Sequence, residues 1–394
     1  MITNLKILDI ENTCTGCGAC ADVCPKNCLK LGSNNEGFYY PQFDSSQCIN
    51  CGLCEKVCHV LNSNEKKAIS EDNFYTYSST QTIIREESSS GGAFTLFAEY
   101  VLAEGGIVYS TLFNENSGIV EVSNSDLFPL KKFRKSKYVE SYVGKSYQAI
   151  HKELKSGRTV LFCGTPCQVA GLKRYLNVLK SDTSKLLTID FICHGVPSAK
   201  CFDAFLSRNK RKVIDVDFRY KDFSQKKTGW HDMVYCEYYA DGSKRVLTSK
   251  NLHYYYYYMP FLDNVSLRKS CFFCNEVNTS SADITIGDFW SIHKDKSIVD
   301  DNKGVSIVKI HTQKASELWD KLKEFGISKN IPYELIESQL TNKNVGCFGV
   351  RNSFFEEVQT RGYLPTVRRR YFMKYIKNTI VRYGYNIKSR IIKK

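Results

Sequence analysis

From residue 74 onward, apolar and polar positions follow two alternating patterns. Short apolar runs such as 159–163 and 284–289 are typical of buried strands. Between the runs lie stretches with apolar residues three or four positions apart, as at Tyr147, Ile150 and Leu154, which is the spacing of an amphipathic helix. The alternation predicts a body of the α/β type rather than a helical bundle.

Turn and cap residues set the expected boundaries of these elements. One helix is expected to run from Gly91 to Gly105, and another to begin at Pro166, because proline is favoured in the first turn of a helix. A further helix is expected at 197–208. The other expected strands lie at 74–78, 107–113, 186–193, 213–220, 231–240, 244–248 and 305–310.

Residues 1–62, which precede this body, are dense in cysteine and are interpreted as a separate module. Short apolar runs at 6–10, 29–31 and 38–41 predict strands within it. The polar stretch that follows has the composition of a linker. The expected organisation is a module at 1–62, a linker at 63–73, a body at 74–350 in two parts (74–157 and 158–350), and a basic tail at 351–394.

The cysteines of the module form two copies of the spacing C-x2-C-x2-C-x3-C. This spacing belongs to bacterial ferredoxins with two [4Fe-4S] clusters, in which the fourth cysteine of each run binds the other cluster. We therefore assign one cluster to Cys14, Cys17, Cys20 and Cys58, and the other to Cys48, Cys51, Cys54 and Cys24. Disulfides and structural zinc are the alternatives, although zinc sites usually pair two C-x2-C knuckles. The pattern predicts a protein that transfers electrons.

Length and composition extend this prediction. With 394 residues the chain is too long for a ferredoxin alone, and two or three domains are expected. No apolar leader precedes the first cysteine and no run has the length of a membrane span, so the 17 cysteines are expected in a reducing cytoplasm as metal-bound thiolates. From Val358 onward there are 11 Lys or Arg and no Asp or Glu, which leaves only +3 of the formal net charge of +14 for the rest.

Two polar stretches of the body are candidates for binding an anion. The stretch 88–93, with Ser88, Ser89, Ser90, Gly91 and Gly92, opens an expected helix, where free N–H groups and the helix dipole favour a phosphate. A plain helix cap is the alternative. The stretch 135–141 places Lys137 beside Tyr138, a pair suited to a phosphate or a flavin ring, with a solvated edge strand as the alternative.

Further cysteines of the body suggest a third metal site. Cys167 stands in the first turn of the helix at Pro166, where the helix N-terminus is expected to lower a thiol pKa, and a Cys163–Cys167 redox pair is one interpretation. We hypothesise a third [4Fe-4S] cluster on Cys167, Cys193, Cys271 and Cys274, against the alternative that some are buried packing residues. Packing is the interpretation preferred for Cys28, Cys201, Cys236 and Cys347. No role is assigned to the five tyrosines at 254–258.

Several motifs, in this order, resemble those of the coenzyme F420 hydrogenase/dehydrogenase beta-subunit family. The matching stretches are Ser-Ser-Gly-Gly at 89–92, Lys-Tyr at 137–138, Gly-Thr-Pro-Cys-Gln at 164–168, Cys-His-Gly-Val-Pro-Ser at 193–198 and Ala-Asp-Ile…Gly-Asp-Phe-Trp at 282–290. The resemblance covers roughly residues 1–320. His59 departs from it by replacing the proline usual after the second cysteine run.

The resemblance implies an iron–sulfur flavoprotein. Its members bind FAD and pass electrons between one-electron carriers and a two-electron acceptor, which is coenzyme F420 in some members and another organic substrate in others. The fold expected from it is α+β, with a ferredoxin-like module before an α/β flavin-binding body. The FAD site would be lined by Ser89, Ser90, Gly91, Gly92, Lys137 and Tyr138, with Asp288 and Phe289 near it.

The expected function is that of an oxidoreductase. Its partners would be a small organic acceptor and a redox protein, either a ferredoxin-like donor or a partner subunit. A non-catalytic electron-transfer subunit is the alternative, and no catalytic residue is assigned. The tail is either a solvated basic segment or a helical surface for an anionic membrane or an acidic partner. Nucleic-acid binding is not expected, because no recognition module accompanies the charge.

Overall fold

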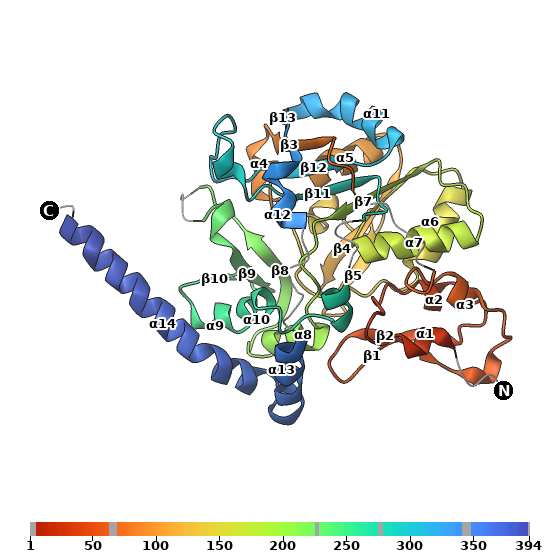
Figure 1. The fold of residues 1–394 in the computed structure, drawn as a ribbon, viewed down its shortest axis with the longest axis horizontal. Coiled ribbons are helices and arrows are strands. Elements are labelled where there is room, and N and C mark those ends of the chain that lie inside the picture. The colour runs from red at the N-terminus through yellow and green to blue at the C-terminus, as the bar shows by residue number, and fades with distance from the viewer. Residues whose placement is uncertain (1–4, 63–68, 225–227, 275–278, 341–347, 393–394) are drawn as a thin grey trace.

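The computed structural model describes residues 5–62, 69–224, 228–274, 279–340 and 348–392, with side chains described as far as Arg382. Residues 63–68 of the expected linker, and Cys347, lie outside the described residues. Figure 1 shows the N-terminal module beside helices α6 and α7 of the body, and the last helix running along another side of the molecule.

The N-terminal module is small and contains one hairpin. Its elements are α1 (Lys6–Asp9), α2 (Ala19–Asp22), β1 (Leu29–Ser33), β2 (Tyr39–Phe43) and α3 (Leu53–Lys56), with β1 and β2 antiparallel. The two later strand predictions are confirmed, whereas the strand predicted at 6–10 is wrong. The segment is a helical turn, because that spacing brings Ile7 and Ile10 to the same cavity among the cysteines.

An eight-stranded sheet forms the centre of the body, in the order β13-β3-β12-β11-β7-β6-β4-β5. Strands β4, β6, β7 and β11 are parallel, and the other pairings are antiparallel. The strands are β3 (Phe74–Ser79), β4 (Ile107–Asn114), β5 (Ile119–Asn124), β6 (Val160–Cys163), β7 (Leu186–Phe191), β11 (Ile284–Asp288), β12 (Ser306–Ile310) and β13 (Gly326–Asn330). The two edge strands, β5 and β13, are short, polar-rich segments that the apolar pattern did not indicate.

Helices cover both faces of this sheet. On one face Phe97 and Trp319 bring α5 (Ala93–Ala103) and α11 (Gln313–Leu322) onto the strands. On the other face, α6 (Ser146–Lys155) and α7 (Pro166–Val178) share a core with Cys17, Ala19 and Val23 of the N-terminal module. The module therefore completes a layer of the body. A short helix, α4 (Thr82–Glu86), connects β3 to the loop before α5.

A second, three-stranded antiparallel sheet lies beside the first, in the order β10-β9-β8. Its strands are β8 (Val213–Tyr220), β9 (Val234–Tyr239) and β10 (Lys244–Leu247). The remaining helices are α8 (Ala199–Leu206), α9 (Leu252–Tyr255), α10 (Tyr258–Leu262), α12 (Glu337–Leu340), α13 (Phe348–Arg361) and α14 (Tyr363–Ile392). All five tyrosines at 254–258 are buried in the aromatic core between this sheet and α14.

The expected basic tail is a structured part of the body. Phe354 and Phe355 of α13 and Val367 and Tyr371 of α14 are buried in the same core, so a solvated tail is wrong for this part of the chain. The boundary predicted at 350 falls inside α13. Farther along α14, Asn378 Nδ2 donates to the Tyr255 hydroxyl at 3.0 Å and Arg382 to the Ser249 carbonyl at 3.1 Å, and the helix runs along one side of the molecule (Figure 1). Within the described ranges no helix is both long and apolar enough to cross a membrane.

Candidate iron–sulfur and flavin sites

The two cysteine runs fold into the same turn. In the first run Gly16 and Gly18 have φ angles of +68° and +80°, and in the second Asn50 and Gly52 take the same places with +55° and +67°. Glycine and asparagine are the residues that adopt this left-handed region at least cost. Each turn leads directly into one helical turn, α2 or α3, so three sulfurs of a run face one space.

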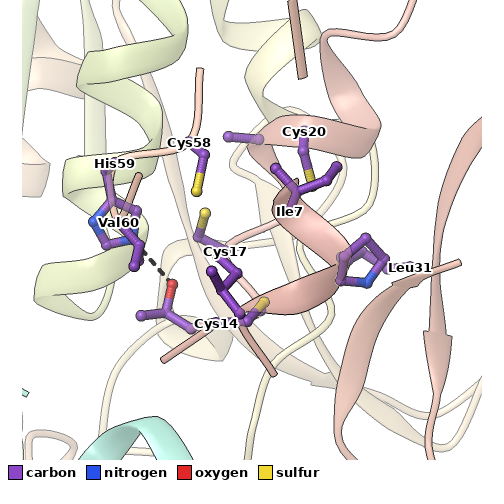
Figure 2. Close-up of a pocket in the computed structure, with 14 residues that line it drawn as sticks. Ile7, Cys14, Cys17, Cys20, Leu31, Cys58, His59 and Val60 are labelled. Atoms are coloured by element: carbon purple, nitrogen blue, oxygen red, sulfur yellow. Dashed lines mark hydrogen bonds between the residues drawn. The ribbon is translucent and has the colours of Figure 1, made fainter. Parts of the chain in front are cut away.

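The first run and the last cysteine of the second run surround one cavity, which we call the inner cavity. Its cysteines are Cys14, Cys17, Cys20 and Cys58, as Figure 2 shows, and Ile7 and Leu31 contribute apolar wall. Beside it His59 is hydrogen-bonded to the Thr15 hydroxyl at 3.0 Å. Burial alone would raise the pKa of Cys17, but His59, Thr15 and a backbone N–H near the sulfur hold it below its ordinary value.

The complementary set surrounds a second cavity, which we call the outer cavity. It is lined by Cys24, Cys48, Cys51 and Cys54, and also by Cys28. The Cys28 N–H donates to Cys24 Sγ at 3.3 Å, so this residue supports a sulfur where the sequence suggested only packing. Cys51 is exposed to solvent, whereas Cys17 of the inner cavity is buried.

These two cavities fit the crossed ligand assignment. All cysteines in the described part of the chain are free thiols, and each cavity gathers three cysteines of one run with the fourth of the other. In the same described ranges, no group of three or more His, Cys, Asp or Glu side chains has the arrangement that a single metal ion would need. A [4Fe-4S] cluster needs one thiolate on each of four irons, and either cavity offers four.

The predicted body cysteines come from three separate segments. Cys167 lies in the first turn of α7, Cys193 follows β7, and Cys271 and Cys274 belong to a 3₁₀ turn at Lys269–Phe273 and its cap. Burial raises the pKa of Cys167, and the charges of Cys274 and Cys193 raise it further. A Cβ at Gly195, two residues after Cys193, would lie 3.3 Å from Cys271 Cβ, so these two segments are in contact. Burial also raises the pKa of Cys271 to about 12, with Cys274 adding to the effect.

The expected lowering of the Cys167 pKa is therefore wrong, because burial raises it well above the ordinary thiol value. Desolvation outweighs the helix N-terminus, and the Thr165 hydroxyl at 3.1 Å from the sulfur only moderates it. Cys163 is also buried, with its pKa raised to about 12, and it lines the same cavity as Cys193 but not as Cys167. Burial raises the pKa values of Cys167, Cys193 and Cys271, which fits a site where a metal supplies the charge that ionises the thiols.

A large cavity, which we call the strand-end cavity, opens at the carboxyl ends of the parallel strands. It has a volume of about 410 Å³ and is lined by residues that end or follow β4, β6, β7 and β11. Ligands of open α/β sheets bind at this edge. It brings together the predicted residues Ser89, Ser90, Gly92, Lys137, Tyr138 and Asp288, and it also contains Cys193 of the body cysteines.

The N-terminus of α5 faces the strand-end cavity without a side-chain cap in the described structure. The predicted alternative, in which these serines simply cap helix α5, is therefore wrong. Ser89 Oγ accepts the Ser136 N–H at 2.7 Å, and Ser90 Oγ donates to the Val305 carbonyl at 2.7 Å. The hydroxyls brace the loop, and the first N–H groups of α5 are directed to the cavity, as an anion site requires.

Two glycines at this turn leave no room for a side chain. A Cβ at Gly91 would lie 2.1 Å from the Tyr77 carbonyl oxygen, and Gly92 has a φ of +100°. The Gly91 N–H donates to Ser306 Oγ at 2.9 Å, so Gly91 fixes the turn without lining the cavity itself.

Lys137 lines the strand-end cavity, but its ammonium group is turned to the backbone. Nζ donates to the carbonyls of Lys132 at 2.9 Å and Lys135 at 3.1 Å, and also to that of Arg134. Burial lowers the pKa of Lys137 to about 8. The residue therefore shapes the loop at the cavity, and in this conformation it is not a free cation for a phosphate.

Tyr138 and Asp288 are held by residues that the sequence did not single out. Arg219 Nη1 lies 3.0 Å from Asp288 Oδ2 and 3.3 Å from the Tyr138 hydroxyl, and Trp230 donates to Asp288 Oδ1 at 2.6 Å. The Trp230 ring stacks on Trp290, with centroids 4.9 Å apart. A buried arginine in a strand is a weak sequence signal, which explains why Arg219 was missed.

Among the residues predicted for the flavin site, Phe289 is one that the structure does not bring to the strand-end cavity. Its side chain is completely buried in an apolar cluster with Phe74, Ile292 and Ile307, and it does not line the strand-end cavity. Neighbouring residues at the end of a strand point to opposite sides, so Asp288 faces the cavity and Phe289 the core.

Helix α7 connects the inner cavity to the body cysteines. A Cβ at Gly171 would lie 2.9 Å from Cys17 Sγ, so the helix backbone contacts a sulfur of the inner cavity. Cys167 stands one turn earlier on the same helix, and the charge of Cys17 contributes to its raised pKa. The cysteine groups and the strand-end cavity thus form one continuous series.

Comparisons with known proteins agree with this architecture. Residues 157–334 match the family model for the C terminus of the beta subunit of coenzyme F420 hydrogenase/dehydrogenase, and residues 13–62 match a 4Fe-4S dicluster domain. Two proteins of Methanocaldococcus jannaschii match the N-terminal module. One is an iron–sulfur subunit of the CoB–CoM heterodisulfide reductase, 46% identical over 61 residues, which are 12% of this chain and 9% of that protein. The other is an uncharacterised ferredoxin, 44% identical over 54 residues, or 14% of this chain and 69% of that protein.

A solved structure of the F420-reducing [NiFe] hydrogenase complex from Methanosarcina barkeri contains a weakly similar chain. The match has a TM-score of 0.45 and 16% identity, and it covers 74% of this chain and 94% of that one. This likeness is too weak to add to the assignment from the family models.

The fold, the cysteine groups and the family models define an iron–sulfur electron-transfer protein of the oxidoreductase type. Within that class, residues 157–334 match the beta-subunit family of coenzyme F420 hydrogenase/dehydrogenase, as the motifs predicted, and this body follows a 4Fe-4S dicluster domain at residues 13–62.

Proposed function

We propose that this chain is an iron–sulfur flavoprotein oxidoreductase that exchanges single electrons with a partner protein and electron pairs with a small organic compound. The inner and outer cavities would each hold a [4Fe-4S] cluster, the body cysteines a third, and the strand-end cavity FAD. The observation that supports the proposal is the order of these sites, in which shared residues, a common apolar cluster and helix α7 join each site to the next.

The contacts in the series are specific. Cys20 of the inner cavity and Cys54 of the outer cavity pack against the same apolar cluster, which is formed by Leu5, Ile7, Ala21 and Leu29. The backbone of α7 at Gly171 touches Cys17 of the inner cavity, and Cys167 begins the same helix. Cys193 belongs both to the body cysteines and to the wall of the strand-end cavity. An electron entering at the exposed Cys51 side would therefore meet every site in turn.

Bound FAD would supply the step that clusters do not, because a flavin takes up electrons singly and releases them in pairs. The chain would provide the binding site. The open N-terminus of α5 would face a phosphate of the cofactor, and the Ser88–Gly92 turn would keep this helix end free of side chains. Arg219 and Trp230 would hold the Asp288 carboxylate at the wall of the cavity.

The organic acceptor is proposed as coenzyme F420 or another two-electron compound. The family model carries the name of coenzyme F420 enzymes, which supports that candidate. The half-exposed rings of Phe191 and Trp290 at the strand-end cavity would give a planar acceptor an apolar surface.

The first test is the cofactor content of the anaerobically purified chain. Three cubane clusters and FAD predict about twelve irons, about twelve acid-labile sulfides and one flavin per chain. About eight irons with flavin would remove the cluster at the body cysteines. A full iron content without flavin, even after incubation with FAD, would contradict the flavoprotein and favour a non-catalytic electron-transfer subunit.

A matched pair of glycine variants tests the flavin site itself. In Gly92→Ala the new side chain would occupy a left-handed residue and lie 2.9 Å from Ile84 Cγ2. In Gly105→Ala, past the other end of α5, the residue also has a positive φ, but the space is open. The first variant should lose flavin and keep its iron, and the second should keep both. Equal flavin content in both variants would place the flavin elsewhere.

A further inference from the structure

The buried side chain of Arg268 lies between the inner cavity and the body. Its exposed fraction is 0%, and each arm of its guanidinium has a partner. Nε donates to the Cys14 carbonyl at 2.7 Å, and Nη2 approaches Cys14 Sγ at 3.7 Å. Nη1 forms a 2.6 Å ion pair with Glu140 Oε1.

The surroundings keep water away from this contact. The guanidinium lies 4.0 Å from the centroid of the Tyr40 ring. Glu140 is buried as well, and its second oxygen accepts the Tyr39 N–H at 3.0 Å. A charge with little access to solvent acts on its neighbours through a lower effective dielectric and is screened less by salt.

The outer cavity has a different electrostatic environment. Its lining includes Lys26, which is exposed to solvent, so that charge is largely screened. The hydrogen bond that its Cys24 sulfur accepts comes from a backbone N–H, that of Cys28, and carries no net charge. The two cavities thus share their ligand pattern and differ in buried charge.

We propose that the cluster of the inner cavity has the higher reduction potential of the two N-terminal clusters, and that Arg268 is the positioning residue that raises it. The proposal rests on the clusters of the proposed function. Reduction adds one negative charge to a cluster, and a buried cation that donates to one of its sulfurs stabilises that charge. Electrostatics then favour moving one electron from the outer cluster, which is oxidised, to the inner cluster, which is reduced, with no bond or proton exchanged. The electron itself comes from the one-electron partner.

Glu140 gives the proposal a second, opposite test. Its carboxylate offsets part of the Arg268 charge, so neutralising Glu140 should raise the potential of the inner cluster, whereas neutralising Arg268 should lower it. A purely structural role for the pair does not predict shifts of opposite sign.

Arg351 provides a matched control. It is also fully buried, it also pairs with a carboxylate of the N-terminal module, Glu36, and it donates to the Leu267 carbonyl at 2.9 Å. Within the described part of the chain, its guanidinium donates to oxygens and not to a cysteine sulfur. Arg351→Gln should therefore disturb the attachment of the module as much as Arg268→Gln without changing the potential of the inner cluster.

The experiment is an anaerobic redox titration of the full chain, followed by electron paramagnetic resonance. A Cys51→Ser variant, which changes a ligand of the outer cavity, identifies the signal of the outer cluster. In Arg268→Gln the inner cluster should show at least a tenfold lower ratio of reduced to oxidised form at fixed potential, which is a shift of about 59 mV for one electron. Arg268→Lys should retain most of the wild-type value, and Glu140→Gln should shift it upward.

Either of two results would overturn the proposal. One is an inner cluster whose potential in the wild-type chain lies at or below that of the outer cluster. The other is equal potentials in Arg268→Gln and Arg351→Gln. If Arg268→Gln does not fold, Glu140→Gln and Arg268→Lys test the proposal in its place. A missing cluster in the wild-type chain would instead count against the proposed function, and iron content distinguishes that case.

Discussion

The inner and outer cavities are built from the same cysteine spacing and the same left-handed turns, yet their neighbours differ. Cys17 of the inner cavity packs into the core that α6 and α7 share with the module, whereas Cys51 of the outer cavity is exposed. The inner cavity borders the buried Arg268–Glu140 pair, and the outer cavity borders solvent. The repeat thus determines how four cysteines are gathered, and the attachment to the body determines what surrounds them.

The largest expected effect, on iron content and stability, comes from removing one cysteine ligand from each cavity. Cys17→Ala should cost a cluster and also leave a cavity in the core shared with α7, so both iron content and the free energy of unfolding should fall. Cys51→Ala should cost only iron, because its side chain lies at the surface. Iron analysis and denaturant unfolding under argon measure both quantities. Equal losses of stability would show that the two sides are equivalent.

The next effect concerns the contact with α7. Gly171→Ala should normally favour a helix by about 1 kcal/mol. Here the new Cβ would lie 2.9 Å from Cys17 Sγ and 3.0 Å from its Cβ, and such overpacking costs about 1–3 kcal/mol. We expect a net loss of stability, accompanied by a change in the signal of the inner cluster alone. A variant more stable than the wild type with unchanged spectra would contradict the contact.

Iron removal should also distinguish the two cavities. Because Cys51 is exposed and the inner cavity is covered by the body, a ferrous chelator should first remove about four irons and the remainder several-fold more slowly. Iron release followed by absorbance provides the rates, and Cys51→Ser should remove the fast phase. A single phase for all N-terminal iron would show that the body does not protect the inner cluster.

The smallest effect should come from making the two runs alike. Pro25 follows the first run, and His59 takes the equivalent place after the second, where it is hydrogen-bonded to Thr15. His59→Pro removes a ring that helps to hold down the pKa of Cys17, whereas Arg268→Gln removes a buried guanidinium charge, so the potential of the inner cluster should fall by less than in Arg268→Gln. Thr15→Val, which removes the same hydrogen bond from the other side, should behave alike. A larger shift than in Arg268→Gln would make His59 the dominant residue.

The parts of this molecule that were predictable depend on local sequence. The spacing of eight cysteines implied both cavities, and the Thr165–Gln168 capping box at Pro166 produces the helix start that was predicted. The predicted strands from β3 to β12 are largely confirmed, because buried strands carry continuous apolar runs. Edge strands such as β13 carry a polar side and gave no such signal.

The parts that were not predictable depend on contacts between distant segments. Arg268 and Glu140 are 128 residues apart, and both contact the N-terminal module. The tyrosine run had no interpretation until the fold placed it against α14, where the Tyr363 hydroxyl donates to the Tyr256 carbonyl at 2.7 Å. Lys137 was correctly placed at the cavity wall by its motif, but the direction of its ammonium group depends on the loop that surrounds it.

Helix α7 limits how the sequences of the module and the body can change in evolution. It carries Cys167 at its first turn and the contact to Cys17 at Gly171, four residues or about 6 Å along its axis. Inserting a single residue between them would rotate one contact by about 100° relative to the other. The helix therefore fixes the distance between its contact with the module and the first cysteine of the body. Neither part can change in sequence at this surface, or be exchanged for a counterpart from another protein, without changing the spacing between Cys17 and Cys167.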